Sequence, residues 1–366
     1  MTDAIIVGGG IVGCACAYFL AQEGIASTVI EPGAIGGGAT AAGMGHVVVM
    51  DDSEAQFALT SYSQQLWDDV YPSLPASCEV RRTGTLWVAA DEEEFQHVAL
   101  KHAFYAERGI PTEALDAQSL TEAEPNLRPG LAGALLVPND SVIYPMAASR
   151  WLLDQAMEKG SKLQQGDTVA SMDSQTVTLK SGEVLKARFV INAAGGHAPS
   201  LTPGLPIDPR KGHLVITDRY PGFVNRQIVE LGYLKSAHSM SAESVAFNVQ
   251  PRATGQLLIG SSRQFVGWNP EIDRNLVSKM IARALEYMPS IGKLSAIRTW
   301  VGYRAATASK LPIIEQWQDG SYIAAGHEGL GITTCMATGR LIADMIAGKP
   351  SAIDRSAFKA AQVASA

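Results

Sequence analysis

Hydrophobic and polar residues follow two periods along the chain, which predict a mixture of strands and helices. Near the N-terminus, a β-branched run at residues 5–7 leads into glycines, then into apolar residues at helical spacing, then into a second strand at 27–30. Helical spacing recurs at 53–70, 91–108, 146–159, 274–288 and 332–348. Strand patterns recur at 81–90, 166–169, 176–179, 186–191, 212–217, 244–250, 256–260 and 322–325. These elements predict a chain of the α/β class.

The first strand runs directly into a glycine pattern, Gly8-x-Gly10-x-x-Gly13. Between a strand and a helix, this spacing is typical of dinucleotide binding: Gly8 permits a tight turn, Gly10 admits a pyrophosphate to the backbone, and Gly13 brings helix and strand together. Glu31 ends the second strand, where a carboxylate accepts hydrogen bonds from ribose hydroxyls and repels a 2′-phosphate. The pattern predicts FAD or NAD, and not NADP.

Composition and charge argue against several classes of protein. The chain has 366 residues, enough for two domains, and its net charge of −7 argues against nucleic-acid binding. Its four cysteines have neither metal-site nor disulfide-framework spacing, and no metal site is predicted. No apolar stretch reaches the ~18 residues of a transmembrane helix, and the N-terminus does not resemble a signal peptide. We expect a cytoplasmic enzyme, with peripheral attachment at the inner membrane face as an alternative.

Three later stretches of small residues predict further close approaches of the backbone to a flat ligand. They are residues 33–45, residues 192–197 after a strand, and the turn 326–331 before the last long helix. The N-terminus of a helix carries partial positive charge, which would stabilise negative charge on a reduced flavin. Because NAD needs no such second site, the pattern favours FAD.

These motifs together resemble the D-amino-acid oxidase superfamily over essentially the whole chain. Besides the glycine pattern with Glu31, the resemblance rests on the motifs GGGATAAGMG at 36–45, NAAG at 192–195, GQLLIG at 255–260, WVGYR at 300–304 and GHEGLG at 326–331. Within the superfamily the chain looks most like D-hydroxyproline dehydrogenases, the hydrogen cyanide synthase flavoprotein subunit and glycine oxidase. The resemblance implies a Rossmann-like FAD-binding domain of the GR2 type and a substrate domain built on a large mixed antiparallel sheet.

The resemblance also implies where the domains lie and which residues act. The FAD-binding domain would comprise residues 1–80, 141–205 and 300–366, and the substrate-binding domain residues 81–140 and 206–299. Arg304 matches the arginine that holds the carboxylate of the amino acid while a hydride leaves Cα for flavin N5. His327 would orient groups near the flavin, and His46 would contact substrate or flavin. Asn248 stands where related enzymes carry a tyrosine, which suits a hydroxylated or ring substrate.

The FAD is expected to be non-covalent, because the chain lacks the cysteine and the histidine at which related enzymes attach it. The residues predicted to bind it, from the fingerprint and from the resemblance, are Gly8, Gly10, Ile11, Val12, Gly13, Glu31, Pro32, Gly38, Ala39, Thr40, Ala42, Gly43, Met44, Gly45, Val169, Ala193, Ala194, Gly195, His197, Gly302, Arg304, His327, Glu328, Gly329, Leu330, Gly331, Ile332 and Thr333.

The leading hypothesis is a dehydrogenase of D-amino acids that prefers cyclic substrates such as D-hydroxyproline or D-proline. Two alternatives stay open: an oxidase of the glycine or sarcosine type that uses O2, and the flavoprotein subunit of a hetero-oligomeric amine dehydrogenase. The expected partners are a small amino acid and an electron acceptor, which is a quinone, a partner flavoprotein subunit or O2. Homo- and hetero-oligomers are both compatible with the sequence.

Overall fold

The chain folds into two compact units, which are described separately. The computed structural model describes residues 2–232 and 243–364. Unit 1 comprises Met1–Cys78, Ile143–Arg210 and Tyr303–Ala366, and unit 2 comprises Glu79–Val142 and Lys211–Gly302. Each unit is built on its own large β-sheet.

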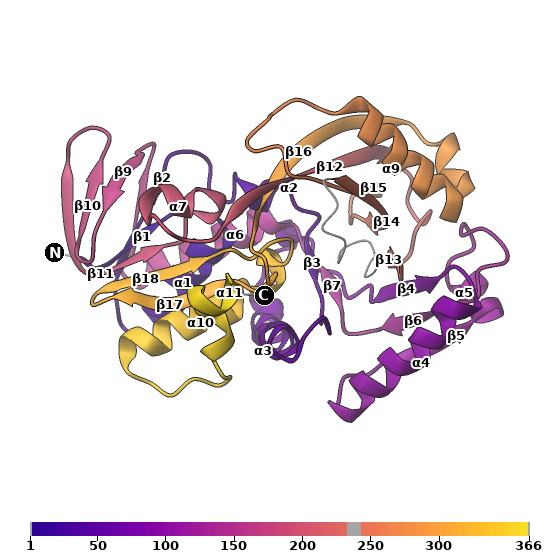
Figure 1. Ribbon diagram of the computed structural model, residues 1–366, viewed down its shortest axis with the longest axis horizontal. Helices are drawn as coiled ribbons and strands as arrows, with labels where there is room; N and C mark the ends of the chain where they lie inside the picture. The colour runs from indigo at the N-terminus through magenta and orange to yellow at the C-terminus, as the bar shows by residue number, and fades with distance from the viewer. Residues whose placement is uncertain (1, 233–242, 365–366) are drawn as a thin grey trace. The chain divides into compact units, whose positions relative to one another are not determined.

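The sheet of unit 1 has a parallel centre (Figure 1). Its strand order is β17–β18–β11–β1–β2–β8, and β1 pairs in parallel with both β11 and β2. Ile5 and Ile6 of β1 are fully buried, as expected for a strand covered on both faces. The strands of this sheet are β1 Thr2–Val7, β2 Ser27–Glu31, β8 Lys162–Gln165, β9 Val169–Met172, β10 Thr176–Leu179, β11 Val184–Asn192, β17 Ile313–Gln318 and β18 Ser321–Ala325, and β3 His46–Val47 lies outside it.

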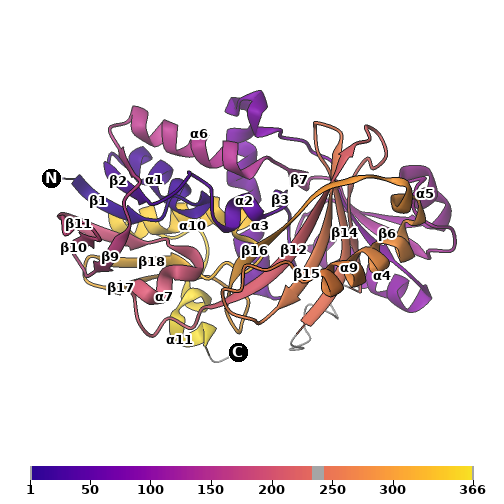
Figure 2. The same ribbon diagram turned by 90° about the horizontal axis from the view of Figure 1, so that it is seen from above.

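Helices of unit 1 pack closely against one another, with α1 in contact with both α6 and α10 (Figure 2). A Cβ added at Gly339 of α10 would lie 2.6 Å from the carbonyl carbon and oxygen of Ala15 of α1, so the two helices touch through their backbones. The helices are α1 Ile11–Gln22, α2 Ala39–Ala42, α3 Glu54–Val70, α6 Pro145–Glu158, α7 Ala198–Leu201, α10 Gly331–Ala347 and α11 Ala360–Val363, with 3₁₀ turns at Tyr71–Ser73, Ala76–Cys78, Gly195–His197 and Ser356–Phe358.

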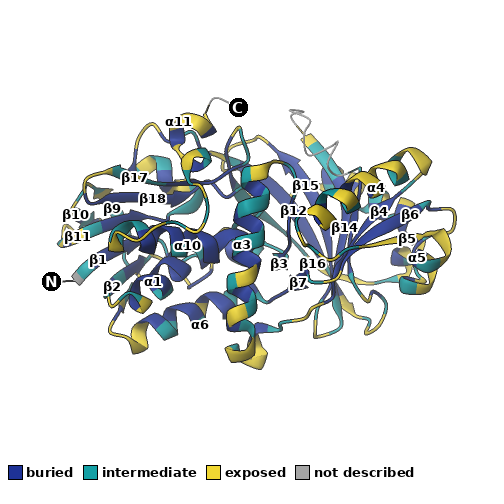
Figure 3. Cartoon of the chain, turned by 90° about the horizontal axis from the view of Figure 1, so that it is seen from below, coloured by how far each residue is buried: buried dark blue, intermediate teal, exposed yellow. Residues whose placement is uncertain are grey.

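Unit 2 contains a mixed sheet of strand order β16–β12–β15–β14–β13–β4–β6–β5, in which β13 and β4 pair in parallel. One face carries a core that includes Leu86, Ile228 and Phe247, with helix α9 packed on it through Met280. The outer faces of α4 and α9 are exposed (Figure 3). The elements are β4 Thr85–Ala89, α4 Glu92–Glu107, β5 Glu113–Asp116, α5 Ala117–Ala123, β6 Gly133–Val137, β7 Ser141–Val142, β12 Asp208–Arg219, β13 Gln227–Glu230, β14 Glu243–Pro251, β15 Gln256–Gln264, α9 Arg274–Tyr287, the 3₁₀ turn Pro289–Lys293 and β16 Ala296–Ala306, of which β12 begins and β16 ends in unit 1.

The predicted mixed α/β fold is confirmed, and two of the predicted strands need correction. Most of the strand predicted at 166–169 is instead the connection between β8 and β9, because Gly166 has a φ of +91° and bends the chain, and β9 begins only at Val169. The strand predicted at 81–90 is shorter, since Gly84, with a φ of +67°, leaves only Thr85–Ala89 as β4. Across the described ranges, no helix is long and apolar enough to span a membrane.

Candidate active site

The glycine turn after β1 is held by close backbone contacts in unit 1. Gly8 has a φ of +110°, and a Cβ there would lie 2.6 Å from the carbonyl oxygen of Ala193. A Cβ at Gly13 would lie 1.9 Å from the carbonyl oxygen of Gly8. Gly10 differs, because the nearest atom to a Cβ there is Thr40 Oγ1, 3.6 Å away. Packing therefore requires glycine at 8 and 13, whereas the backbone at Gly10 has open space before it.

Helix α1 begins directly after this turn with its N-terminus uncapped by its own side chains. Gly10 is the N-cap residue, and the first turn of α1 contains no acidic residue. The Ile11 N–H donates to Thr40 Oγ1 at 3.1 Å, which fixes the loop containing α2 beside the helix. A helix start of this kind presents N–H groups and partial positive charge to an anion.

Glu31 lies at the end of β2, beside the same turn. Its carboxylate accepts the Gly9 N–H at 2.8 Å through Oε2 and the Gly33 N–H at 2.8 Å through Oε1. Each carboxylate oxygen has more than one lone pair, so these bonds leave acceptor capacity for hydroxyl groups. The carboxylate is thus oriented by the backbone next to the helix start, where a ribose would be held.

Residues 43–48, which follow the short helix α2, contact the start of helix α10. A Cβ at Gly43 would lie 2.9 Å from Ile332 Cδ1. Thr333 Oγ1 donates to the carbonyl of His46 at 3.0 Å and accepts the Val48 N–H at 3.3 Å. The loop of small residues is therefore attached to the first turn of α10, and His46 is held there through its backbone.

The chain passes the glycine turn a second time after β11. The Ala193 N–H donates to the carbonyl of Val7 at 2.9 Å. Asn192 is fully buried; its Nδ2 donates to the Ala198 carbonyl at 3.0 Å and its Oδ1 accepts the Ala194 N–H at 3.2 Å. Asn192 thereby holds the backbone of 193–198 in place beside Gly8.

Arg304 lies near the end of β16, beside the turn that leads into α10. Its Nε is 3.5 Å from where a Cβ on Gly329 would lie, an ordinary contact distance that places the side chain directly against the turn. The Glu328 N–H donates to the carbonyl of Ala305 at 2.8 Å and ties the turn to the strand. Glu328, at a φ of +48°, also pairs with Arg210 at 3.4 Å.

Helix α10 begins after this turn, again without a side-chain cap and without an acid in its first turn. Ser63 Oγ donates to the Thr333 carbonyl at 2.6 Å, and Trp67 Nε1 donates to the Ile332 carbonyl at 3.2 Å. These bonds from α3 fix the first turn of α10. The partial positive charge of the helix is therefore held on a rigid support.

His327 is buried within the turn, and its Nε2 is 3.0 Å from Thr338 Oγ1 of α10. Burial lowers the pKa of His327 to about 3, because an imidazolium is poorly solvated there. The ring is therefore neutral near pH 7. This geometry favours a positioning role for His327, in which it joins the turn to the helix.

Other predicted residues are spread over both units. Unit 1 contains Val12 in α1, Pro32 and Gly38 on the exposed part of the loop, Ala39 and Ala42 in α2, Met44 and Gly45 after it, and Leu330 and Gly331 at the start of α10. Val169 packs on the cluster that includes Ile5 and Val7, whereas Gly195 lies, half-buried, in a 3₁₀ turn that ends at the exposed His197. Asn248 and Gly302 belong to unit 2. Asn248 is buried, and its side-chain amide is 3.4 Å from Ser261 Oγ.

The parts gathered in unit 1 fit a dinucleotide cofactor. The open backbone at Gly10 and the start of α1, which has no acidic residue in its first turn, suit a pyrophosphate, and the oriented carboxylate of Glu31 suits a ribose. The start of α10, which has no side-chain cap, offers a second region of positive potential, which would suit the negative charge of a reduced flavin ring. Within the described residues, no group of three His, Cys, Asp or Glu side chains is placed to hold a metal ion.

Several supporting residues were not predicted from the sequence. Gly9 is one of them. A Cβ there would lie 2.8 Å from Ile35 Cδ1, so packing favours glycine at this position. The sequence indicated this only through the run of three glycines that contains Gly9. Arg210 and Thr338 are others, and each pairs with a residue of the turn 326–331. Nothing in the local sequence indicates these pairings, since Arg210 and Glu328 are 118 positions apart.

Comparison with known proteins gives consistent matches over most of the chain. A profile of the family of FAD dependent oxidoreductases, DAO, matches residues 3–345. The chain is 26% identical to the hydrogen cyanide synthase subunit HcnC of Pseudomonas aeruginosa, covering 98% of this chain and 96% of that protein. It is 26% identical to a D-amino acid dehydrogenase of Xanthobacter autotrophicus, over 84% of this chain and 74% of the relative. The crystal structure of glycine oxidase from Geobacillus kaustophilus superposes with a TM-score of 0.86 at 25% identity, covering 98% and 97% of the two chains.

Proposed function

Because the chain belongs to the DAO family of FAD-dependent oxidoreductases, we propose that it oxidises a D-amino acid, preferably a cyclic one such as D-hydroxyproline or D-proline. The predicted family and its FAD cofactor are confirmed, as is the coarser activity, oxidation of amino acids or amines. The similarity to a D-amino acid dehydrogenase supports a D-amino acid as the substrate. Unit 1 is proposed as the FAD-binding domain and unit 2 as the substrate-binding domain.

The observation that carries this proposal is the position of Arg304 beside the turn into α10. A guanidinium matches the two oxygens of a carboxylate and binds it through paired hydrogen bonds. In this proposal Arg304 holds the substrate carboxylate, and its side chain lies against Gly329 of the turn. The role of Asn248 as a substrate residue stays a prediction.

The residues of unit 1 then perform distinct tasks. When bound, FAD supplies the two-electron acceptor for oxidation of the C–N bond of the substrate. The start of α10, fixed by Ser63 and Trp67, stabilises negative charge that develops near it. Neutral His327 holds the turn that orients Arg304 and α10. In total the substrate loses two electrons and two protons, as a hydride from Cα and a proton from nitrogen, to become an imine, which water hydrolyses outside the redox step.

The experiment is anaerobic bleaching of the flavin absorbance by a panel of D-proline, D-hydroxyproline, other D-amino acids, glycine, sarcosine and L-proline. We expect the cyclic D-amino acids to bleach the flavin fastest. Arg304→Gln should lower the rate at low substrate concentration by about 100-fold, because it removes a bidentate charge-assisted contact. Arg298→Gln, an exposed arginine of the same strand, is the matched control. Equal rates in the two variants would contradict the proposed role of Arg304.

A second candidate is an oxidase of the glycine or sarcosine type, favoured by the similarity to glycine oxidase. Bleaching by glycine or sarcosine alone, with stoichiometric peroxide on admission of air, would establish it. A third candidate is the flavoprotein subunit of a hetero-oligomer, favoured by the similarity to a hydrogen cyanide synthase subunit. Lack of turnover with artificial acceptors, restored by a partner subunit, would establish that role.

Flavin attachment is tested separately. We propose that FAD is held without a covalent bond, as the sequence predicts. Acid precipitation should release all of the yellow colour into the supernatant. Colour retained in the protein pellet would contradict non-covalent binding.

A further inference from the structure

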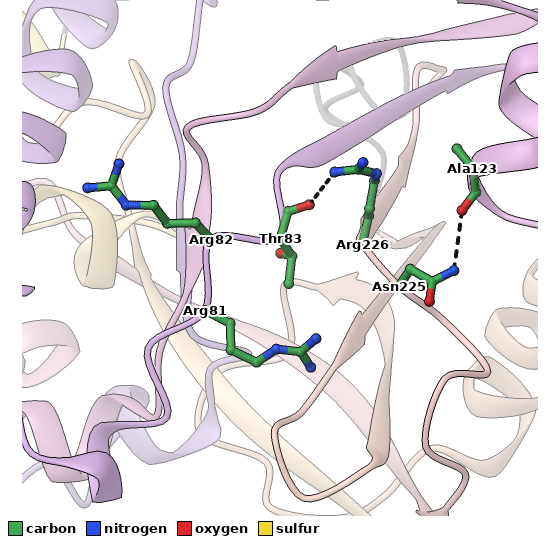
Figure 4. Close-up of a pocket in the computed structure, with 6 residues that line it drawn as sticks. All are labelled: Arg81, Arg82, Thr83, Ala123, Asn225 and Arg226. Atoms are coloured by element: carbon green, nitrogen blue, oxygen red, sulfur yellow. Dashed lines mark hydrogen bonds between the residues drawn. The ribbon is translucent and has the colours of Figure 1, made fainter.

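A separate cavity of about 540 Å³ lies in unit 2. None of its lining residues is assigned above to cofactor or substrate, and none of them is acidic. Figure 4 shows the residues that line it: Arg81, Arg82, Thr83, Ala123, Asn225 and Arg226. The cavity is therefore lined by three cations in a chain whose net charge is −7.

One wall of the cavity, residues 81–84, is fixed by backbone hydrogen bonds. The Arg81 N–H donates to the Val142 carbonyl at 3.0 Å, and the Val142 N–H returns a bond to the Arg81 carbonyl at 2.9 Å. The Gly84 N–H donates to the Asp140 carbonyl at 3.0 Å. This wall consequently presents its side chains from an ordered backbone, which lowers the entropy lost when a ligand binds.

The opposite wall is fixed by a buried carboxylate. Glu124, which is fully buried, accepts the Asn225 N–H at 3.0 Å and the Arg226 N–H at 2.6 Å. Asn225 Nδ2 also donates to the Ala123 carbonyl at 3.3 Å. The lone pairs of Glu124 are thus directed at the backbone, and burial raises the pKa of its carboxyl to about 7. Near neutral pH this group offsets only part of the positive charge of the cavity.

The polar groups of the cavity include the guanidiniums of Arg81 and Arg226 and the hydroxyl of Thr83. Arg226 Nη1 donates to the Thr83 carbonyl at 2.9 Å, which orients the guanidinium and leaves its other N–H groups for a ligand. Figure 4 shows Arg81 and Arg226 on either side of Thr83, with the guanidinium of Arg82 turned away from both. Thr83 is 6% exposed, and within residues 2–232 and 243–364 its Oγ1 has no hydrogen-bond partner. A buried hydroxyl without a partner is destabilising, and a bound acceptor would offset that cost.

We propose that this cavity binds a small anion carrying two or more negative charges on carboxylate or phosphate groups. Arg81 and Arg226 supply paired N–H donors, which match the geometry of both kinds of group, and Thr83 supplies a hydroxyl donor. The volume lies in the range of cavities that enclose small metabolites. Binding here requires neither the amino-acid substrate nor Arg304, so the site is independent of the proposed function.

The test is isothermal titration calorimetry on the FAD-loaded protein, with phosphate, pyrophosphate, succinate and citrate at ionic strength held constant with chloride. We expect saturable binding at one site, and the phosphate and carboxylate titrations show which group is preferred. Arg81→Gln and Arg226→Gln should each raise Kd at least tenfold, and Arg226→Lys should raise it less. Arg219→Gln, an exposed arginine of the same unit, should leave Kd unchanged.

Folding is controlled by the choice of variants. No side-chain hydrogen bond or ion pair of Arg81 occurs in the part of the chain that the structure describes, so Arg81→Gln should retain its FAD content and circular dichroism. The proposal is overturned if none of the anions binds saturably to the wild type, or if Arg219→Gln weakens binding as much as Arg81→Gln does. It is also overturned if Arg304→Gln abolishes binding and Arg81→Gln does not, because the anion would then occupy the candidate active site.

Discussion

Replacing Gly10 by alanine tests whether this glycine is needed for binding the cofactor and not for folding. Gly10 has φ −68° and ψ 173°, values that alanine adopts without strain. The nearest atom to the new methyl group would be Thr40 Oγ1 at 3.6 Å, an ordinary contact distance. The methyl group would instead occupy the open space in front of the helix start, where the pyrophosphate is expected.

Gly10→Ala should have a small effect on the stability of the apoprotein and a large effect on FAD binding. The free energy of unfolding of the apoprotein should change by no more than about 1 kcal/mol, since the backbone conformation and packing both tolerate alanine. FAD binding should weaken by about 3 kcal/mol or more, roughly 100-fold in Kd, because charge-assisted contacts to backbone N–H groups are lost. Gly13→Ala is the opposite case: its Cβ would lie 1.9 Å from the Gly8 carbonyl oxygen, so the apoprotein itself should fail to fold.

The assay combines urea denaturation of the apoprotein with a titration of FAD followed by quenching of flavin fluorescence. Wild-type FAD affinity in Gly10→Ala would refute the assignment of the pyrophosphate to this turn. An apoprotein destabilised by several kcal/mol would instead show that Gly10 is a packing residue like Gly13. Unchanged FAD affinity would require a different position for the cofactor.

Three further predictions concern groups away from Gly10. For Glu124, a pKa raised from about 4.5 to about 7 means that its contribution to stability is complete below pH 4.5 and is lost as pH rises through 7. The difference in unfolding free energy between wild type and Glu124→Gln should therefore shift by about 3 kcal/mol in favour of the variant from pH 4.5 to 8, and a constant difference would contradict this. His327, with its pKa near 3, should show no NMR titration between pH 5 and 8; a midpoint within that range would place it in a more polar environment. Gly339→Ala should destabilise unit 1 by about 1–3 kcal/mol in thermal or urea unfolding, because its methyl group would overlap the Ala15 backbone, and an unchanged stability would mean that α1 and α10 separate easily.

The sequence patterns predicted the mixed α/β fold because they depend on interactions between residues that are close in sequence. The β-branched run of β1, the glycine turn and the periodicity of helices such as α9 depend on neighbours within a few residues. The strand predicted at 166–169 starts too early for the same reason: the pattern includes Gly166, whose φ of +91° bends the chain, whereas β9 begins at Val169.

Contacts between distant parts of the chain could not be predicted in this way. Thr333 bonds to both His46 and Val48, and Arg210 pairs with Glu328, yet each pair is separated by more than 100 positions. The two walls of the arginine-lined cavity also come from segments far apart in sequence, and no motif marks them. Such pairings follow from the order of strands in the sheets, which single-sequence periodicity does not contain.

The most direct test of the account is an anaerobic titration of the FAD-loaded protein with D-hydroxyproline or D-proline, followed by the visible absorbance of the flavin. The account predicts complete bleaching at one substrate molecule per flavin, with no bleaching by L-proline. An absorbance that stays unchanged with every D-amino acid, in protein that retains its full FAD content, would contradict it.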